Sequence, residues 1–141
     1  MALAQVGKGG VALAALMSLT MTSPLFSGDV EGTSLKTARK AAGRDAKTPE
    51  GKAWERQHAV WLGPAITPTS QECGRRAAEG MRKLFTVYLR LSKAGAVSEA
   101  LVSPETPYSM CFRDGVRTLT YPEVPRDGYW LEIRMHPSPP E

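Results

Sequence analysis

An alternating stretch in the second half of this 141-residue chain limits the fold more than any other feature. In residues 85–91 (FTVYLRL), large apolar side chains recur at every second position. A period of two is typical of a strand with one apolar face. Gly95 then supplies a turn, and residues 96–103 form a second extended run that Pro104 ends. The two runs predict a β-hairpin.

A helix signal precedes the hairpin. Thr48 stands before Pro49, which is the order of an N-cap followed by a first-turn proline. Trp54, His58 and Trp61 then recur at intervals of four and three residues. This spacing predicts a helix with an apolar stripe that begins at residue 48.

Further signals complete the order of elements. The Gly63-Pro64 pair is expected to break or kink the first helix, and residues 68–81 are expected to form a second one. The Thr106-Pro107 pair repeats the cap signal and predicts a helix over residues 106–118, and residues 129–135 (YWLEIRM) predict a last strand. The expected fold class is therefore α+β. N-terminal helices precede a three-stranded antiparallel sheet with one packed helix, in the order α-α-β-β-α-β.

The N-terminal segment has the pattern of an export signal. Residues 1–10 include Lys8 and no acid, residues 11–21 are apolar and uncharged, and residues 22–27 are mostly small or polar. This order predicts a cleaved signal peptide over residues 1–27. The apolar run is shorter than the roughly 20 residues of a membrane span, so we expect no stable anchor after cleavage. An uncleaved anchor or a buried helix is the alternative. The expected location is periplasmic or secreted.

The segment after the signal is polar and basic. Residues 28–47 contain few large apolar side chains, so we expect a lead-in that is either mobile or a short helix. Its basic side chains are suited to a solvated surface or to contact with phosphate or anionic lipid. They are Lys36, Arg39, Lys40, Arg44 and Lys47. A single α+β domain over residues 48–136 and a tail over residues 137–141 complete the expected organisation. The net charge of +4 is too mild to predict a nucleic-acid partner.

Cys73 and Cys111 are the two cysteines of the chain. An exported protein with an even number of cysteines usually pairs them. A crosslink over 38 residues would stabilise the fold by about 3 to 4 kcal/mol. Two separate buried thiols are the alternative to this disulfide.

Residues 85–135 carry a resemblance to a known family. The features are the FTVYLRL strand, a K-A-G-A-V turn, a strand that ends in proline, a helix with Cys111, and a Tyr121-Pro122 loop before the last strand. Together they resemble the C-terminal domain of TonB-type energy transducers and related small exported envelope proteins. The resemblance implies a three-stranded sheet with one packed helix, in a protein that works by contact. The proline-rich spacer of such transducers has no counterpart in this sequence, so their energy-coupling role is not expected.

Catalytic and metal chemistry find little support in the residue pattern. His58 and His136 are the only imidazoles, and paired cysteines would leave no thiol nucleophile. The spacings C-x-x-C and H-x-x-x-H, typical of zinc sites, do not occur. His58 is expected to be a partly buried packing residue in its helix. We therefore expect no catalytic residue, no metal site and no cofactor.

A binding surface is the remaining candidate for a functional site. It would lie on the outer face of the sheet and consist of Tyr88, Arg90, Trp130, Glu132 and Arg134. Tyrosine, tryptophan and arginine are enriched at interaction hot spots. Glu99 would share this face and pair with the arginines across strands. The alternative is that the N-terminal helices cover the face, because Trp54 and Trp61 need a surface to pack against. The last strand could also lie at the sheet edge, where a partner can add a strand.

These observations favour a small exported non-enzymatic protein that acts through protein–protein contacts in the cell envelope. Its expected partner is an envelope or secreted protein. Two alternatives stay open at this point. The first is a secreted inhibitor or immunity-type protein that blocks an enzyme. The second is a metal-binding or enzymatic periplasmic protein that uses His58, His136 and the methionines.

Overall fold

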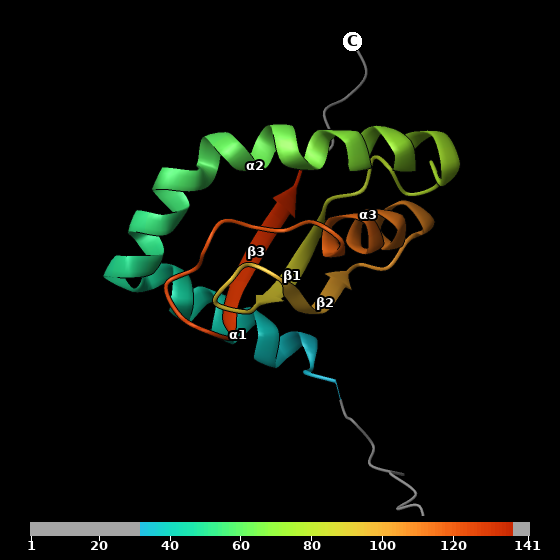
Figure 1. Cartoon of the computed structure of the whole chain (residues 1–141). Coiled ribbons are helices and arrows are strands. Elements are labelled where there is room, and N and C mark those ends of the chain that lie inside the picture. Colours follow the sequence, from blue (N-terminus) through green and yellow to red (C-terminus); the bar gives the residue numbers. More distant parts are fainter. Residues whose placement is uncertain (1–31, 137–141) are drawn as a thin grey trace, which may run out of the picture. The chain divides into compact units, whose positions relative to one another are not determined.

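The computed structural model describes residues 32–136, so the predicted signal segment and the C-terminal tail lie outside the described residues. The elements are α1 (Leu35–Lys47), α2 (Pro49–Arg76), β1 (Phe85–Leu91), β2 (Val97–Ser103), α3 (Pro107–Arg117) and β3 (Tyr129–Met135). Their order confirms the predicted α+β class and its α-α-β-β-α-β layout (Figure 1). Within the described part, none of the helices combines the length and the apolar character that a membrane crossing needs.

The three strands form one antiparallel sheet in the order β2-β1-β3. β1 lies in the centre, with Val87 opposite Val102 of β2 and Ile133 of β3. The predicted hairpin turn is present and depends on Gly95, which has a φ of +89°. A Cβ on this glycine would lie 1.9 Å from the carbonyl oxygen of Tyr121. Only glycine therefore fits the turn where it meets the loop before β3.

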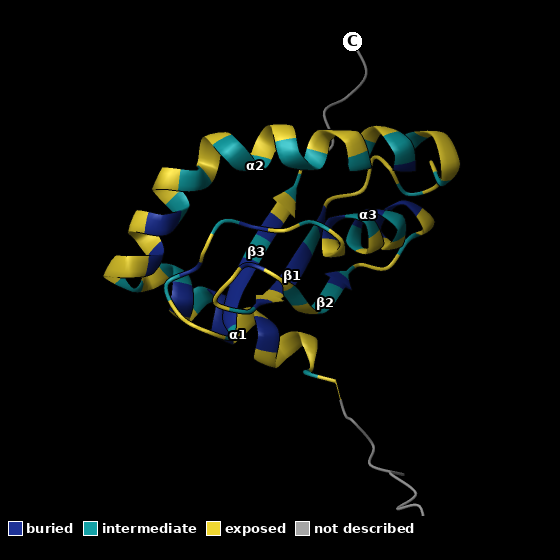
Figure 2. Cartoon of the chain, viewed as in Figure 1, coloured by how far each residue is buried: buried dark blue, intermediate teal, exposed yellow. Residues whose placement is uncertain are grey.

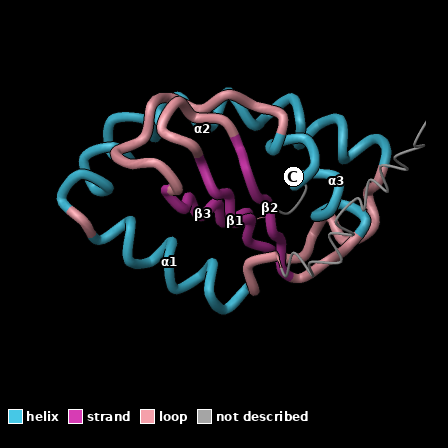
Figure 3. Tube along the Cα trace, turned by 60° about the horizontal axis from the view of Figure 1, so that its bottom comes forward, coloured by secondary structure: helices cyan, strands magenta, loops and turns pink. Residues whose placement is uncertain are grey.

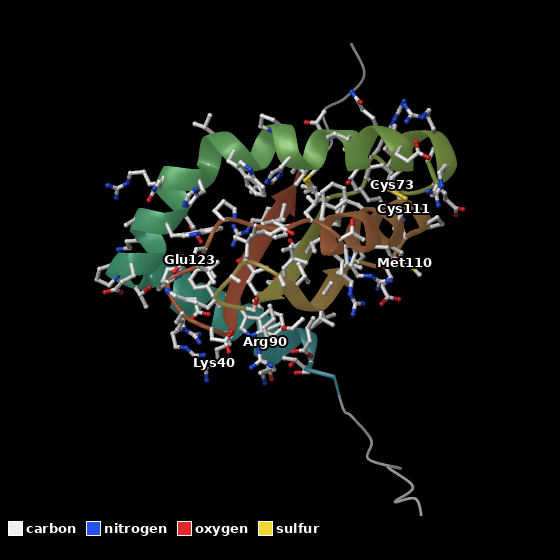
Figure 4. All side chains as sticks on the ribbon, in the orientation of Figure 1. Lys40, Cys73, Arg90, Met110, Cys111 and Glu123 are labelled. Atoms are coloured by element: carbon white, nitrogen blue, oxygen red, sulfur yellow. A yellow bond between two sulfur atoms is a disulfide. The ribbon has the colours of Figure 1, made fainter. Side chains whose placement is uncertain are left out.

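One face of the sheet carries the main apolar core, which α2 and α3 cover. The odd-numbered residues of β1, from Phe85 to Leu91, are buried there together with Phe112 and Val116 of α3. Cys73 of α2 and Cys111 of α3 form a disulfide at this layer, as the sequence predicted (Figure 4). The same apolar face that predicted β1 therefore positions both helices.

Helix α2 is a single helix of 28 residues, so the expected break or kink at Gly63-Pro64 is not a break, and the prediction of a separate helix over residues 68–81 is wrong. Figure 1 shows a bend in α2 instead. A proline inside a helix lacks the N–H that would bond four residues back, which here is the carbonyl of Val60 for Pro64. Val60 is 84% exposed, so water can reach this carbonyl and the helix continues through the proline.

The other face of the sheet is covered by α1, and this corrects the prediction of a polar lead-in. Ala38, Ala41 and Ala42 of α1 are buried against Tyr88 and Trp130 of the sheet. Figure 3 shows the sheet between α1 on one side and α2 with α3 on the other, and Figure 2 shows the strands as the most buried layer. The helix needs no large apolar side chains of its own, because the sheet supplies them. The folded domain therefore begins before residue 48.

Candidate functional site

Two of the five residues of the predicted interaction surface are buried, and the other three are exposed or half-buried. Tyr88 and Trp130 are only 2% and 6% exposed because α1 lies over them, so their assignment to an exposed binding face is corrected. Arg90 and Arg134 are exposed, and Glu132 is half-buried. The covering helix is α1, whereas the helix with the tryptophans packs on the opposite face. The outer face of the sheet is a second core rather than a free surface.

The charged residues of this face form ion pairs, as the sequence suggested. Arg90 Nη1 lies 3.4 Å from Glu99 Oε2 across β1 and β2. Arg134 Nε lies 2.6 Å from Glu132 Oε1, a pair along β3 rather than across strands. Glu99 and Glu132 lie on strands separated by β1, so they do not form a carboxylate pair for acid–base chemistry. Each carboxylate instead forms an ion pair with an arginine.

Glu99 also holds the start of α1. The N–H and the hydroxyl of Thr33 donate to the two carboxylate oxygens of Glu99 at 3.1 and 3.0 Å. Burial alone would raise the pKa of Glu99, but these two hydrogen bonds and the Arg90 guanidinium lower it below its usual value. The ionised carboxylate therefore fastens the N-terminal end of α1 to β2.

Strand β3 is an edge of the sheet, as expected, and α1 closes only one part of that edge. The N–H of Trp130 donates to Asp45 Oδ2 of α1 at 2.9 Å, so this N–H points away from β1. Backbone groups two residues apart point the same way in a strand. The N–H and carbonyl groups of Glu132 and Arg134 therefore also face outward. Among residues 32–136, no group hydrogen-bonds to these outward backbone groups, so the edge is open here in the described part of the chain.

Asp45 is a site residue that the sequence analysis missed. It is buried and accepts hydrogen bonds from Arg126 Nη2 at 2.5 Å and from the Trp130 N–H. A signal was present, because Asp45 is the only acid in an otherwise basic helix. Buried charges in proteins are normally paired, so a lone acid in such a segment points to a fixed partner.

A groove of about 480 Å³ lies between α2 and β3. We call it the α2–β3 groove, and its lining includes Trp54, Glu55, His58, Trp61, Leu131 and Glu132. The α2 residues among these recur at helical spacing, so they project toward β3 along one side of the helix. The groove therefore runs beside the open edge of β3.

Aromatic packing sets the walls of the α2–β3 groove. The rings of Trp54 and His58 lie 5.0 Å apart between centroids, and Trp54 Nε1 donates to the carbonyl of Glu123 at 2.7 Å. Trp61 packs edge-on against Tyr121 with centroids 5.5 Å apart. The hydrogen bond from Trp54 and the ring contact of Trp61 both anchor the groove wall to the loop before β3. His58 is half-buried against Trp54, which agrees with the packing role predicted for it.

The groove holds a partly desolvated carboxylate. Burial raises the pKa of Glu55, the hydroxyl of Tyr129 opposes this shift from 3.5 Å, and the nearby charge of Glu132 adds to it. Burial also raises the pKa of Tyr129, so its hydroxyl stays protonated and can donate. Lys52 and Arg56 also line the groove, so it carries side chains of both charges.

Metal-binding and thiol chemistry were also considered for the described part of the chain. Residues 32–136 contain no group of three or more His, Cys, Asp or Glu side chains arranged to hold a metal ion. Both cysteines are consumed in the disulfide. His136 is exposed at the end of β3. Comparison of the chain with protein-family models, with curated proteins and with solved structures finds no match.

Proposed function

We propose that the protein is a non-enzymatic binding protein of the cell envelope, which recognises an extended segment of a partner protein at the edge of β3. The partner segment adds to β3 as a further strand at Glu132 and Arg134. Its side chains enter the α2–β3 groove. The observation that carries the proposal is the coincidence of an open strand edge with an aromatic-lined groove beside it.

The open edge supplies backbone affinity. Unpaired N–H and carbonyl groups of an edge strand are a template for another chain, and proteins usually block them with charge, proline or a covering helix. Here α1 blocks only the part of the edge at Trp130, through Asp45. Strand addition provides main-chain hydrogen bonds, and neighbouring pockets provide the choice of side chain.

The α2–β3 groove is the pocket that would select the side chains of the partner segment. Trp61 lines the groove and is half-buried, so it offers rigid aromatic surface of the kind that is enriched at interaction hot spots, whereas Trp54 is only 8% exposed. Glu55 and Glu132 line the same groove together with Lys52 and Arg56, so the groove offers charges of both signs to a partner segment. A lysine or arginine placed there would offset the desolvation of Glu55.

The disulfide fits a non-cytoplasmic compartment, where such bonds persist. A periplasmic or secreted location and the cleavage of residues 1–27 are parts of the proposal. The likeness to TonB-type C-terminal domains stays a prediction, and the function does not rest on it. An inhibitor or immunity-type role would use the same surface, and the identity of the partner distinguishes it from an envelope adaptor.

Site-specific photo-crosslinking in intact cells tests the proposal. A crosslinking amino acid is placed at Arg134 and, as the control, at the highly exposed Val60 of α2. We expect one dominant protein adduct from position 134 and none from position 60. Mass spectrometry of the adduct identifies the partner.

A matched pair of variants then tests strand addition to that partner. Arg134→Pro removes an outward N–H from the edge, where proline is tolerated, whereas Arg134→Ala removes the same side chain and keeps the N–H. We expect Arg134→Pro to weaken partner binding by about tenfold or more relative to Arg134→Ala. Equal affinities of the two variants would contradict strand addition.

A further inference from the structure

The outer side of α1 carries a row of cations that the proposed partner site does not use. We call this row the basic face of α1, and it consists of Lys36, Arg39, Lys40, Arg44 and Lys47. All five residues are exposed, and Figure 4 shows Lys40 on the side of α1 away from the sheet. Within residues 32–136, none of the five forms an ion pair with an acid.

The fold holds these cations on one side of the helix. At about 100° per residue, the basic face spans an arc of about 140°, and the buried residues Ala38, Ala41 and Ala42 lie opposite it. Asp45, the only acid of the helix, also lies on the buried side. From its first to its last member the row is about 17 Å long. Arg39 donates to the hydroxyl of Tyr88 at 3.1 Å and lies near the charge of Glu132. The other four cations of the row have no acid partner among the described residues.

We infer that the basic face docks the protein onto the anionic headgroups of a phospholipid bilayer. The cations are spread along a helix rather than directed at one point, which suits a plane of headgroups better than a single small anion. The helix contains no aromatic residue, so it offers no platform on which nucleic-acid bases could stack. Lysine and arginine clusters near a bilayer surface each contribute attraction to anionic lipid.

The sequence before α1 fits this occupant. The apolar run at residues 11–21 ends a short distance before Leu35, where α1 begins. Export would therefore bring α1 out next to a bilayer. Because the apolar residues of α1 are buried against the sheet, attachment is electrostatic and reversible and differs from insertion of an amphipathic helix. Docking through α1 leaves α2, on the other side of the sheet, uncovered.

Vesicle co-sedimentation of the purified full chain tests the inference. The probes are vesicles that contain phosphatidylglycerol and, as the neutral reference, pure phosphatidylcholine vesicles. The test variant is Lys36→Gln/Lys40→Gln/Arg44→Gln, which removes three cations and keeps good helix formers. Each cation near the surface contributes about fivefold, so the triple variant is expected to bind anionic vesicles on the order of 100-fold more weakly. Salt raised from about 0.1 M to about 0.5 M is expected to release the parent protein.

The matched control is Arg75→Gln/Arg76→Gln/Arg82→Gln, which changes the net charge equally at exposed positions outside α1. We expect this control to bind like the parent, and thermal unfolding verifies that both variants fold. Equal loss in the control, equal binding to neutral vesicles, or unchanged binding of the α1 variant would overturn the inference. Binding of a DNA oligonucleotide through the basic face, without vesicle binding, would also overturn it and assign the face to nucleic acid.

Discussion

The two faces of the sheet are closed by different means. On the α2 and α3 side, helices and strands both contribute large apolar residues, and the Cys73–Cys111 disulfide joins the two helices. On the α1 side, the strands contribute Tyr88 and Trp130, while the helix contributes alanines and the buried Asp45. The first layer depends on apolar area and a covalent link. The second depends on close approach of small residues and on polar anchors.

This difference predicts where each layer is vulnerable. Loss of apolar area or of the crosslink should weaken the α2 and α3 side most. Loss of a single hydrogen-bonding group, or a small increase in side-chain size, should weaken the α1 side. The following changes test that contrast.

Removal of the disulfide is expected to have the largest effect. The double variant Cys73→Ser/Cys111→Ser frees a 38-residue loop in the unfolded chain, so the free energy of unfolding should fall by about 3 to 4 kcal/mol. Urea unfolding measures the change. Reductant should destabilise the parent by a similar amount and leave the double variant unaffected. A loss below about 1 kcal/mol would contradict the role given to this crosslink.

Asp45→Ala tests the polar anchor of the α1 side. The change leaves the Trp130 N–H without its acceptor and Arg126 without its partner, so the free energy of unfolding should fall by about 2 to 3 kcal/mol. Asp45→Asn keeps an oxygen acceptor and should lose clearly less. Urea unfolding of both variants provides the comparison. Equal stability of Asp45→Ala and the parent would show that α1 is held in another way.

Adjacent positions in α1 test the close approach of small residues. Ala42 is 1% exposed, so Ala42→Leu should overpack the layer and cost about 1 to 3 kcal/mol. The control is Gly43→Ala, because a Cβ at Gly43 meets no atom within 4 Å. This control should raise stability by about 0.5 to 1 kcal/mol, since glycine is unfavourable inside a helix. Thermal unfolding that showed stabilisation by both changes would contradict a tightly packed α1.

The acid dependence of stability gives the smallest expected effect. Because the folded-state pKa of Glu99 is lowered, its contribution is present above the unfolded pKa of about 4.3 and is lost as pH falls toward the folded value. Glu55 has the opposite sign, since its raised pKa makes the folded state less stable as pH rises above about 4.3. Urea unfolding across this range should show a shallower acid loss in Glu99→Gln and a steeper one in Glu55→Gln.

The α2 and α3 side could be predicted from the sequence because its signals are local. The alternation in β1 and the cap before α3 follow from short patterns, and the pairing of the cysteines follows from their number. The continuity of α2 was not predictable in this way, because it depends on Val60 facing water, where the carbonyl freed by Pro64 can be solvated.

The α1 side escaped prediction because its partners are distant in sequence. Ala41 and Ala42 carry no strong apolar signal, and they become core residues only when Tyr88 and Trp130 lie opposite them. The same pairing removes both aromatic residues from the expected binding surface. The open edge of β3 could be anticipated from strand order, whereas the α2–β3 groove required the tertiary structure. Asp45 was the one visible hint of this second layer.

Native-state amide hydrogen exchange of residues 35–47 shows whether α1 is an integral layer of the domain. We expect amides in the middle of α1 to exchange slowly, with protection comparable to that of α3. We also expect Asp45→Ala to lower this protection while β1 stays protected. Exchange of α1 at the rate of an unfolded peptide, with the sheet and α3 fully protected, would mean that residues 35–47 are a mobile lead-in and not a layer of the domain.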